Sequence, residues 1–206
     1  PAVPIATMNN FVLDTSLYHN EMFRDVDDDK WYGANHEGII QTIVELGIME
    51  GDGNGDFRPD CNVSLAETIK AACVICSIYL GDGYDFSVSA GEAWYLPYIC
   101  YAVENGIIAA EDFSDYTAFA SRAETAYILA HSLPERELSV VNEASGPSDV
   151  MENSAYGSEI YLLYRGGVLA GNDSEGTFLP DAYITRAEIA AIVSRLALPK
   201  LRKMPN

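Results

Sequence analysis

Three groups of residues in this chain have the types and spacing from which chemical sites are built. Cys73 and Cys76 form a C-x-x-C pair, a spacing used in redox centres and in half of a zinc site. Residues 52–56 read Asp-Gly-Asn-Gly-Asp, which places oxygens at the first, third and fifth positions of a calcium loop. The histidines are His19, His36 and His131.

The residues around these groups argue against a metal or catalytic site. The cysteine pair lies in an apolar stretch typical of a helix interior, without a second ligand pair at zinc spacing. The calcium pattern has Phe57 instead of Gly at its sixth position and Val63 instead of Glu at its twelfth, which leaves only weak surface binding open. The histidines are far apart, and no H-E-x-x-H, G-x-S-x-G or phosphate-loop motif occurs. We predict no metal, no cofactor and no enzyme activity.

The composition narrows the classes of partner. The chain has 206 residues, 49% of them hydrophobic, which is enough to build a core. Its 31 acidic and 12 basic residues give a net charge of −19, so we expect no nucleic-acid partner and no docking on anionic lipid. The sequence lacks a continuous apolar run of about 18 residues, which predicts no membrane insertion. Residues 1–10 do not read as a signal peptide, so we expect any export signal to have been removed.

A four-residue pattern recurs three times in the sequence and indicates the helices that would position any site. Ser64–Glu67, Ser121–Glu124 and Thr185–Glu188 each read S/T-x-A-E and start 57 and then 64 residues apart. A Ser or Thr followed three residues later by Glu forms a capping box, in which each side chain bonds to the other residue's backbone amide. We therefore interpret Ser64, Glu67, Ser121, Glu124, Thr185 and Glu188 as structural caps that begin three apolar helices.

A second marker keeps the same period. Gly-apolar steps at Gly47, Gly106 and Gly167 lie 59 and 61 residues apart, each behind residues with helical apolar spacing. Each repeat is therefore predicted to be helix, loop and helix. One such pair is too small to bury its own apolar faces, so the three repeats should pack on one another. We predict an all-α fold with, at most, short extended pairs in the loops.

These landmarks together resemble the S-layer homology family over about residues 23–198. The first repeat carries Phe23–Val26, Trp31-Tyr32, Leu46–Ile48 and Gly55–Pro59; the third carries Ser148–Val150, Gly166–Val168 and Gly176–Phe178. The departures are Leu65 where the family usually has Arg, Ala155 where the Trp normally stands, and a second repeat without the Asp-Val start or the Gly-x-Phe-x-Pro turn.

The resemblance implies a fold, a partner and a location. It implies a pseudo-threefold spindle with a central helical bundle, whose grooves bind secondary cell-wall polymer, often through a pyruvylated amino sugar. We expect a monomeric pseudo-trimer on the surface of a bacterial cell, as part of a secreted protein. The expected segments are a leader at 1–22, repeats at 23–82, 83–146 and 147–199, and a tail at 200–206.

Six residues are candidates for binding the polymer: Arg122, Arg186, Asp25, Asp149, Trp31 and Trp94. Arg suits a carboxylate because its planar fork donates two hydrogen bonds. Its place in the first turn of a helix is electrostatically poor for a cation, which favours a role in binding. We also expect Arg186 to be dispensable for folding, because Thr185 and Glu188 already cap the helix. The aspartates are equally compatible with turn roles, and the tryptophans with core packing.

Two other functions stay open at this point. The repeats can form a protein–protein assembly module of an S-layer. A pair of catalytic carboxylates can also lie hidden among the 31 acidic residues, since such a pair leaves no sequence signature.

Overall fold

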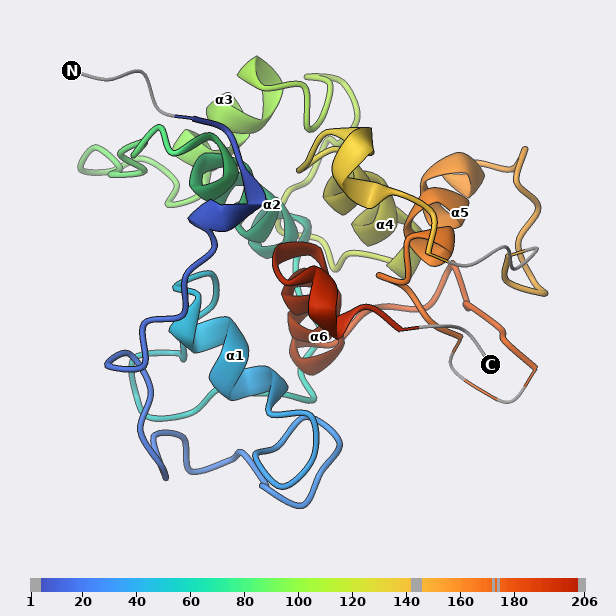
Figure 1. The fold of residues 1–206 in the computed structure, drawn as a ribbon. Helices are drawn as coiled ribbons and strands as arrows, with labels where there is room; N and C mark the ends of the chain where they lie inside the picture. The colour runs from blue at the N-terminus through green and yellow to red at the C-terminus, as the bar shows by residue number, and fades with distance from the viewer. Residues whose placement is uncertain (1–4, 142–145, 172, 174, 204–206) are drawn as a thin grey trace.

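The computed structural model describes residues 5–141, 146–171, 173 and 175–203 (Figure 1). All regular structure in these ranges is helical, which confirms the predicted fold class. The α-helices are α1 (Ile39–Glu45), α2 (Leu65–Leu80), α3 (Leu96–Glu104), α4 (Arg122–Ala130), α5 (Gly157–Arg165) and α6 (Arg186–Ala197). Short 3-10 helices are η1 (Met8–Asn10), η2 (Glu135–Leu138) and η3 (Pro199–Leu201).

Helices α2, α4 and α6 begin in capping boxes at the three S/T-x-A-E sequences. In each box the hydroxyl of the first residue accepts from the amide of the Glu. The amides of Ser64, Ser121 and Thr185 donate in return to the Glu67, Glu124 and Glu188 carboxylates, at 2.8, 2.8 and 2.9 Å. The caps fix where the three helices start, because they satisfy donors that have no partner inside the helix.

The first two amides of each of these helices donate to backbone carbonyls of a neighbouring repeat. The Leu65 and Ala66 amides donate to carbonyls of Ala118 and Tyr116 at 2.9 and 2.8 Å. The two amides at the start of α4 bond in the same way to residues 182 and 180, and those of α6 to residues 61 and 59. Each of these helix starts therefore depends on a loop from another repeat.

Three residues directly before the caps join the repeats in a closed ring of backbone hydrogen bonds. The Val63 amide donates to Ile184, the Ile184 amide to Ala120, and the Ala120 amide to Val63, at 3.1, 3.3 and 2.9 Å. All three side chains are buried, at 0–1% exposure. The ring includes isolated β-bridges, which are the short extended pairs that the sequence allowed. The pseudo-threefold spindle itself remains a prediction.

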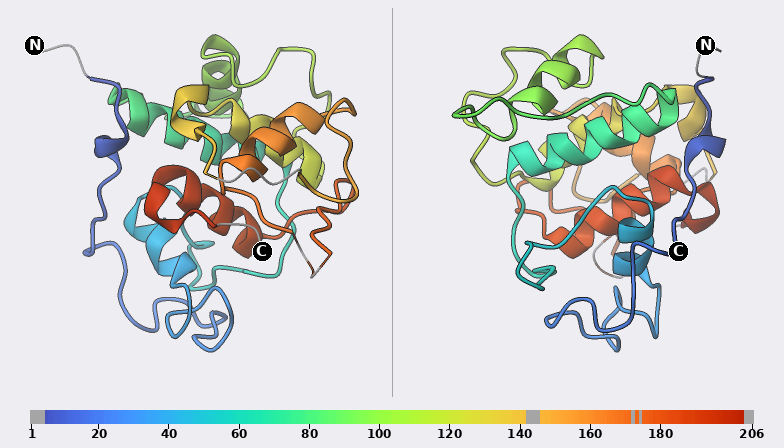
Figure 2. Two further views of the ribbon diagram at one scale, coloured as in Figure 1. Left: turned by 45° about the vertical axis from the view of Figure 1, so that its right-hand side comes forward. Right: turned by 90° about the vertical axis from the view of Figure 1, so that its left-hand side faces the viewer.

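The outer helices pack across the repeat boundaries of the sequence. Helix α1 packs on α6, α3 on α2, and α5 on α4, while α2 also contacts α4 and α6. The right-hand view of Figure 2 shows α3, α2, α6 and α1 following one another from top to bottom. An outer helix thus buries its apolar face on the inner helix of a different repeat. The segments 1–22, 23–82, 83–146, 147–199 and 200–206 remain a proposal, and residues 1–4, 142–145, 172, 174 and 204–206 lie outside the described ones.

One continuous apolar core runs through the described part of the chain. It includes the large side chains of Phe57, Ile69, Tyr79, Leu129 and Phe178, all at 2% exposure or less. The four cysteines are free thiols; Cys73 is buried and its Sγ donates to the Tyr98 carbonyl at 3.2 Å. Within the described residues, every helix is too short or too polar to cross a bilayer.

Candidate functional site

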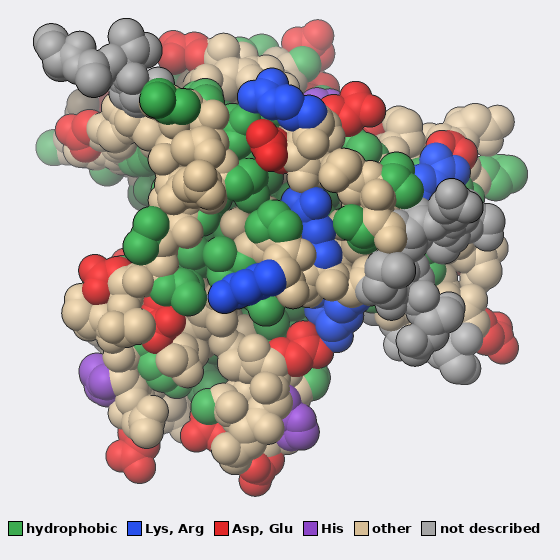
Figure 3. Space-filling view, in the orientation of Figure 1, with side chains coloured by type: hydrophobic (Ala, Val, Ile, Leu, Met, Phe, Trp, Pro, Cys, Tyr) green, Lys and Arg blue, Asp and Glu red, His purple; other side chains and the backbone are tan. Residues whose placement is uncertain are grey.

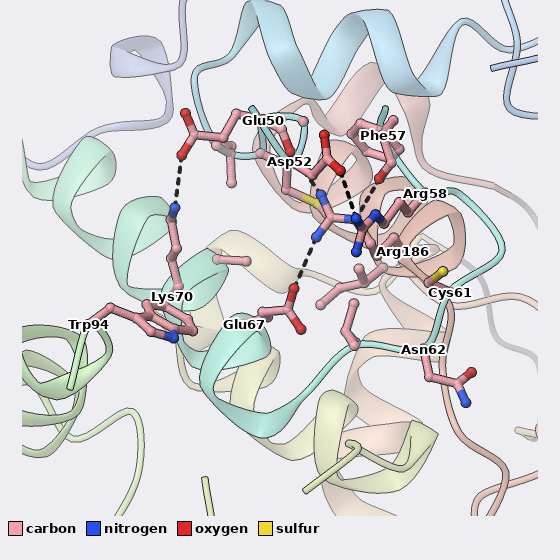
Figure 4. Close-up of a pocket in the computed structure, with 16 residues that line it drawn as sticks. Glu50, Asp52, Phe57, Arg58, Cys61, Asn62, Glu67, Lys70, Trp94 and Arg186 are labelled. Carbon is pink, nitrogen blue, oxygen red and sulfur yellow. Dashed lines mark hydrogen bonds and ion pairs between the residues drawn. The ribbon is translucent and has the colours of Figure 1, made fainter. Parts of the chain in front are cut away.

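Two hollows lie where repeats meet, and each is lined by residues from all three. The first groove has a volume of about 630 Å³ and is lined by Glu50, Arg58, Glu67, Lys70, Trp94 and Arg186, among others (Figure 4). The second groove has a volume of about 390 Å³; its lining includes Trp31, Asp60, Arg122, Glu188, Arg195 and Lys203. Each groove therefore contains one of the candidate tryptophans and one of the candidate arginines.

Arg186 reaches from the start of α6 into the loop of the first repeat. Its Nε donates to the Phe57 carbonyl at 2.7 Å, its Nη2 to the Glu50 carbonyl at 2.8 Å, and its Nη1 to the Glu67 carboxylate at 3.2 Å. The guanidinium carbon also lies 5.0 Å from the centre of the Phe57 ring. Figure 4 shows the guanidinium between Glu67 and Phe57. The side chain is 15% exposed, so it forms part of the wall of the first groove.

Arg122 makes equivalent contacts in the second groove. Its Nε donates to the Phe178 carbonyl at 2.7 Å, its Nη1 bonds to Glu188 at 2.8 Å, and the guanidinium lies 5.0 Å from the Phe178 ring centre. Burial lowers the pKa of Arg122, and the nearby Glu188 carboxylate opposes that shift. Sequence reasoning expected Arg186 to be dispensable for folding. The hydrogen bonds instead lead us to expect a structural role, because each arginine ties two repeats together.

Asp25 and Asp149 hold the turns that carry the two buried phenylalanines. The Asp25 carboxylate accepts from the amides of Phe57 and Arg58 at 2.8 and 2.7 Å. Asp149 accepts from Phe178 and residue 179 at 2.7 Å each. Both turns contain a non-glycine residue with φ near +60°, a backbone state that L residues adopt only at a cost. The aspartates therefore position the groove loops, with their oxygens directed at backbone amides.

Trp31 and Trp94 are the exposed aromatic faces of the grooves. They are 43% and 46% exposed, and each ring packs edge to face on the tyrosine that follows it, Tyr32 or Tyr95. Such a ring offers a free apolar face whose orientation is fixed by its neighbour. The sequence left open whether these tryptophans belong to the core; in the structure both lie at a groove surface.

The capping glutamates have a second contact that local sequence does not reveal. Glu67 bonds through one oxygen to the Ser64 cap and through the other to Arg186. Glu188 divides its oxygens in the same way between the Thr185 cap and Arg122. A residue explained by its cap therefore also anchors the groove arginine.

The third junction, around Tyr127 and Tyr156, lacks both the arginine and the tryptophan: by position in the repeats, Leu65 corresponds to the arginine and Ala155 to the tryptophan. Tyr127 and Tyr156 have ring centres 5.1 Å apart, and the Tyr127 hydroxyl donates to Asp112 at 2.6 Å. Burial, followed by the hydrogen bond to Asp112, raises the pKa of Tyr127 above its usual 10.0. Leu65 itself is buried at 4% exposure. This junction is packed with tyrosine rings.

Sequence reasoning missed the cations Lys70, Arg195 and Lys203. Lys70 pairs with Glu50 at 3.1 Å in the first groove. Arg195 and Lys203 both contact Glu37, from α6 and from the segment after η3. One local signal was available for Arg195, because it is a charged residue within the apolar run of α6.

The acidic turn at 52–56 is held internally: the Asp52 carboxylate accepts from two amides of the turn and pairs with Arg58 at 2.8 Å.

Comparison with known proteins finds a known domain in the first and third repeats. The S-layer homology domain matches residues 23–69 and 148–190. The chain is also 28% identical over 175 residues to the surface-layer 125 kDa protein of Lysinibacillus sphaericus, with 80% of this chain aligned. The alignment spans only 15% of that protein's length. The chain therefore contains two regions that match the S-layer homology domain, one in the first repeat and one in the third.

Proposed function

We propose that this chain is a non-catalytic module that anchors a secreted bacterial protein by binding secondary cell-wall polymer in the two grooves. The two matches to the S-layer homology domain and the similarity to a surface-layer protein support a cell-surface anchoring or S-layer role. The proposal includes residues 83–146 as a second, divergent repeat, because α3 and α4 repeat the arrangement of the flanking repeats. The proposed ligand within this polymer is a pyruvylated amino sugar.

The observation that carries the proposal is the same pairing in both grooves. One exposed tryptophan faces a hollow whose wall holds an arginine from a different repeat, Trp94 with Arg186 and Trp31 with Arg122. An indole face stacks on the apolar face of a sugar ring, and the surrounding polar groups bond to its hydroxyls. Because the overall charge of −19 repels an acidic polymer, binding needs cations at the grooves themselves.

Sedimentation with purified cell-wall sacculi tests the proposal. The chain should pellet with intact sacculi and stay in solution with sacculi stripped of their polymer. Trp31→Ala and Trp94→Ala should each weaken binding by roughly three- to tenfold, because each removes one stacking face while leaving the core intact. Phe119→Ala is the matched control, since Phe119 is an aromatic residue at 52% exposure that lines neither groove.

The same experiment separates the remaining functions. An S-layer assembly module would self-associate without sacculi, and a carbohydrate-active enzyme would release soluble sugar from them. Unchanged pelleting of the Trp31→Ala, Trp94→Ala double variant would contradict binding in the grooves.

A further inference from the structure

Arg195 is a buried cation with loose contacts at the wall of the second groove. It is 7% exposed, its Nη1 lies 3.4 Å from the Val168 carbonyl, and its Nη2 lies 3.5 Å from the Glu37 carboxylate. Its Nε has no hydrogen-bond partner among the residues that the structure describes. Arg122, in the same groove, makes its two side-chain hydrogen bonds at 2.7 and 2.8 Å. A buried donor without an acceptor is costly, so the environment of Arg195 favours an added acceptor.

Lys203 brings a second cation to the same place. Its Nζ lies 2.6 Å from one Glu37 oxygen, while Arg195 faces the other oxygen. The Lys203 side chain is 43% exposed, and both cations line the second groove. Glu37 precedes α1 and is 36% exposed, so its carboxylate can move into solvent. The two cations thus hold one carboxylate that a ligand's acidic group can replace.

The segment from Arg195 to Lys203 is basic, although the protein as a whole is acidic. Four of the 12 basic residues lie between positions 195 and 203: Arg195, Lys200, Arg202 and Lys203. Figure 3 shows Lys and Arg side chains gathered toward the middle of the face that contains α6, with many Asp and Glu side chains toward its margins. The second groove is lined by three cations and two carboxylates, whereas the first is lined by three of each. An anion that displaces Glu37 is therefore favoured more strongly in the second groove.

We propose that Arg195 and Lys203 form an anion subsite of the second groove, which binds a carboxylate or phosphate group of an acidic glycan in place of Glu37. Arg122 is the poorer candidate for this task, because the Phe178 carbonyl and Glu188 already accept short hydrogen bonds from its Nε and Nη1. The glycan part of the proposal rests on the proposed function, since Trp31 supplies the sugar-stacking face in the same groove. The anion subsite itself does not depend on that function.

Nuclear magnetic resonance of the arginine side chains tests the subsite directly. The parent chain, labelled with nitrogen-15, is titrated with inorganic phosphate and separately with pyruvate, each against sodium chloride at equal ionic strength. The Nε–H signal of Arg195 should shift saturably with at least one of the two anions. Which of the two binds tells whether the subsite takes a phosphate or a carboxylate.

Two charge variants should change anion binding in opposite directions, and a third serves as the control. Lys203→Gln removes one cation and should weaken anion binding by about three- to tenfold, whereas Glu37→Gln removes the competing carboxylate and should strengthen it by a similar factor. Lys200→Gln is the matched control, because Lys200 is an exposed lysine of η3 outside the groove lining. Melting temperatures of all three variants show whether folding is intact.

The subsite is wrong if chloride reproduces the Arg195 shift, or if Glu37→Gln binds phosphate and pyruvate no better than the parent. Sacculi pelleting separates this failure from failure of the proposed function. Loss of pelleting in Trp31→Ala without any effect of Lys203→Gln would support wall binding and overturn the subsite's role in it. Saturable anion binding to a chain that never pellets would support the subsite and contradict the anchoring function.

Discussion

The first groove and the third junction share their backbone hydrogen bonds between repeats and differ in their side chains. The Arg186 amide donates to the Cys61 carbonyl at 2.9 Å, and the Leu65 amide donates to Ala118 at the same distance. Both helices begin in a capping box. The backbone contacts that join the repeats are therefore independent of whether the junction can bind a ligand.

The side chains decide what each junction does. The first groove has Trp94 at its edge and an arginine in its wall, around a hollow of about 630 Å³. The third junction has Ala155 at the place of the tryptophan, and Tyr127 and Tyr156 pack against each other there. Leu65 and Ala155 correspond, by their positions in the repeats, to the groove arginine and the groove tryptophan. We infer that this chain keeps two grooves for binding and uses the third junction for packing.

The largest expected effect comes from giving the second groove the side chain of the third junction. Arg122→Leu should lower the free energy of unfolding by about 2–4 kcal/mol, because it removes two hydrogen bonds at a buried position and leaves Glu188 without its cation. Urea unfolding followed by circular dichroism measures the loss.

Arg24→Leu is the matched control for that experiment. Arg24 pairs with Asp56, but its side chain is 69% exposed, so the loss should stay below about 1 kcal/mol. Equal losses for Arg122→Leu and Arg24→Leu would show that the groove arginine contributes no more than a surface charge does.

Sequence predicts the parts of this fold that are encoded locally. The three capping boxes follow from residues three positions apart, and the helix starts that they imply are those of α2, α4 and α6. The contact between Arg186 and Phe57 spans 129 residues, and nothing in either segment alone identifies the partner. The packing of α1 on α6 has the same origin, because an apolar helix face specifies burial without specifying the neighbour.

The candidate site likewise has features that the sequence predicts and features that only the folded chain reveals. Trp31 and Trp94 could be proposed from the repeat, but their exposure and their pairing with arginines of other repeats required the folded chain. Asp25 and Asp149 turned out to hold backbone amides of distant turns. Arg195 and Lys203 come together because Glu37, more than 150 residues earlier, lies between them.

A smaller effect tests the tyrosine packing of the third junction. The raised pKa of Tyr127 means that the folded state favours the neutral phenol, so this stabilisation is complete below the usual value of 10.0. It is lost as the pH rises above 10.0 through the higher pKa of the folded state. Tyr127→Phe should cost about 1 kcal/mol at neutral pH, through the lost bond to Asp112, and should make the alkaline fall in stability shallower.

Urea unfolding at neutral pH and at a series of pH values above 10.0 measures this difference. Tyr161→Phe is a control, because the Tyr161 hydroxyl donates to a backbone carbonyl, which does not titrate. A Tyr127→Phe variant whose stability falls with pH as steeply as that of the parent would show that the third junction does not hold its tyrosine in the neutral form.

The smallest expected effect tests whether the backbone and the side chains of a groove are separable. Leu179 is 49% exposed and has φ of 59°, a conformation that glycine adopts without steric cost. Asp149 holds this residue through its amide, which glycine retains. Leu179→Gly should therefore raise the free energy of unfolding by about 0.5–1 kcal/mol and leave sacculi binding unchanged, whereas Leu17→Gly, at an exposed loop position without positive φ, should lower it by a similar amount. If Leu179→Gly destabilises the chain as much as Leu17→Gly does, the turn is held by the leucine side chain, and the backbone of the second groove is not an independent scaffold.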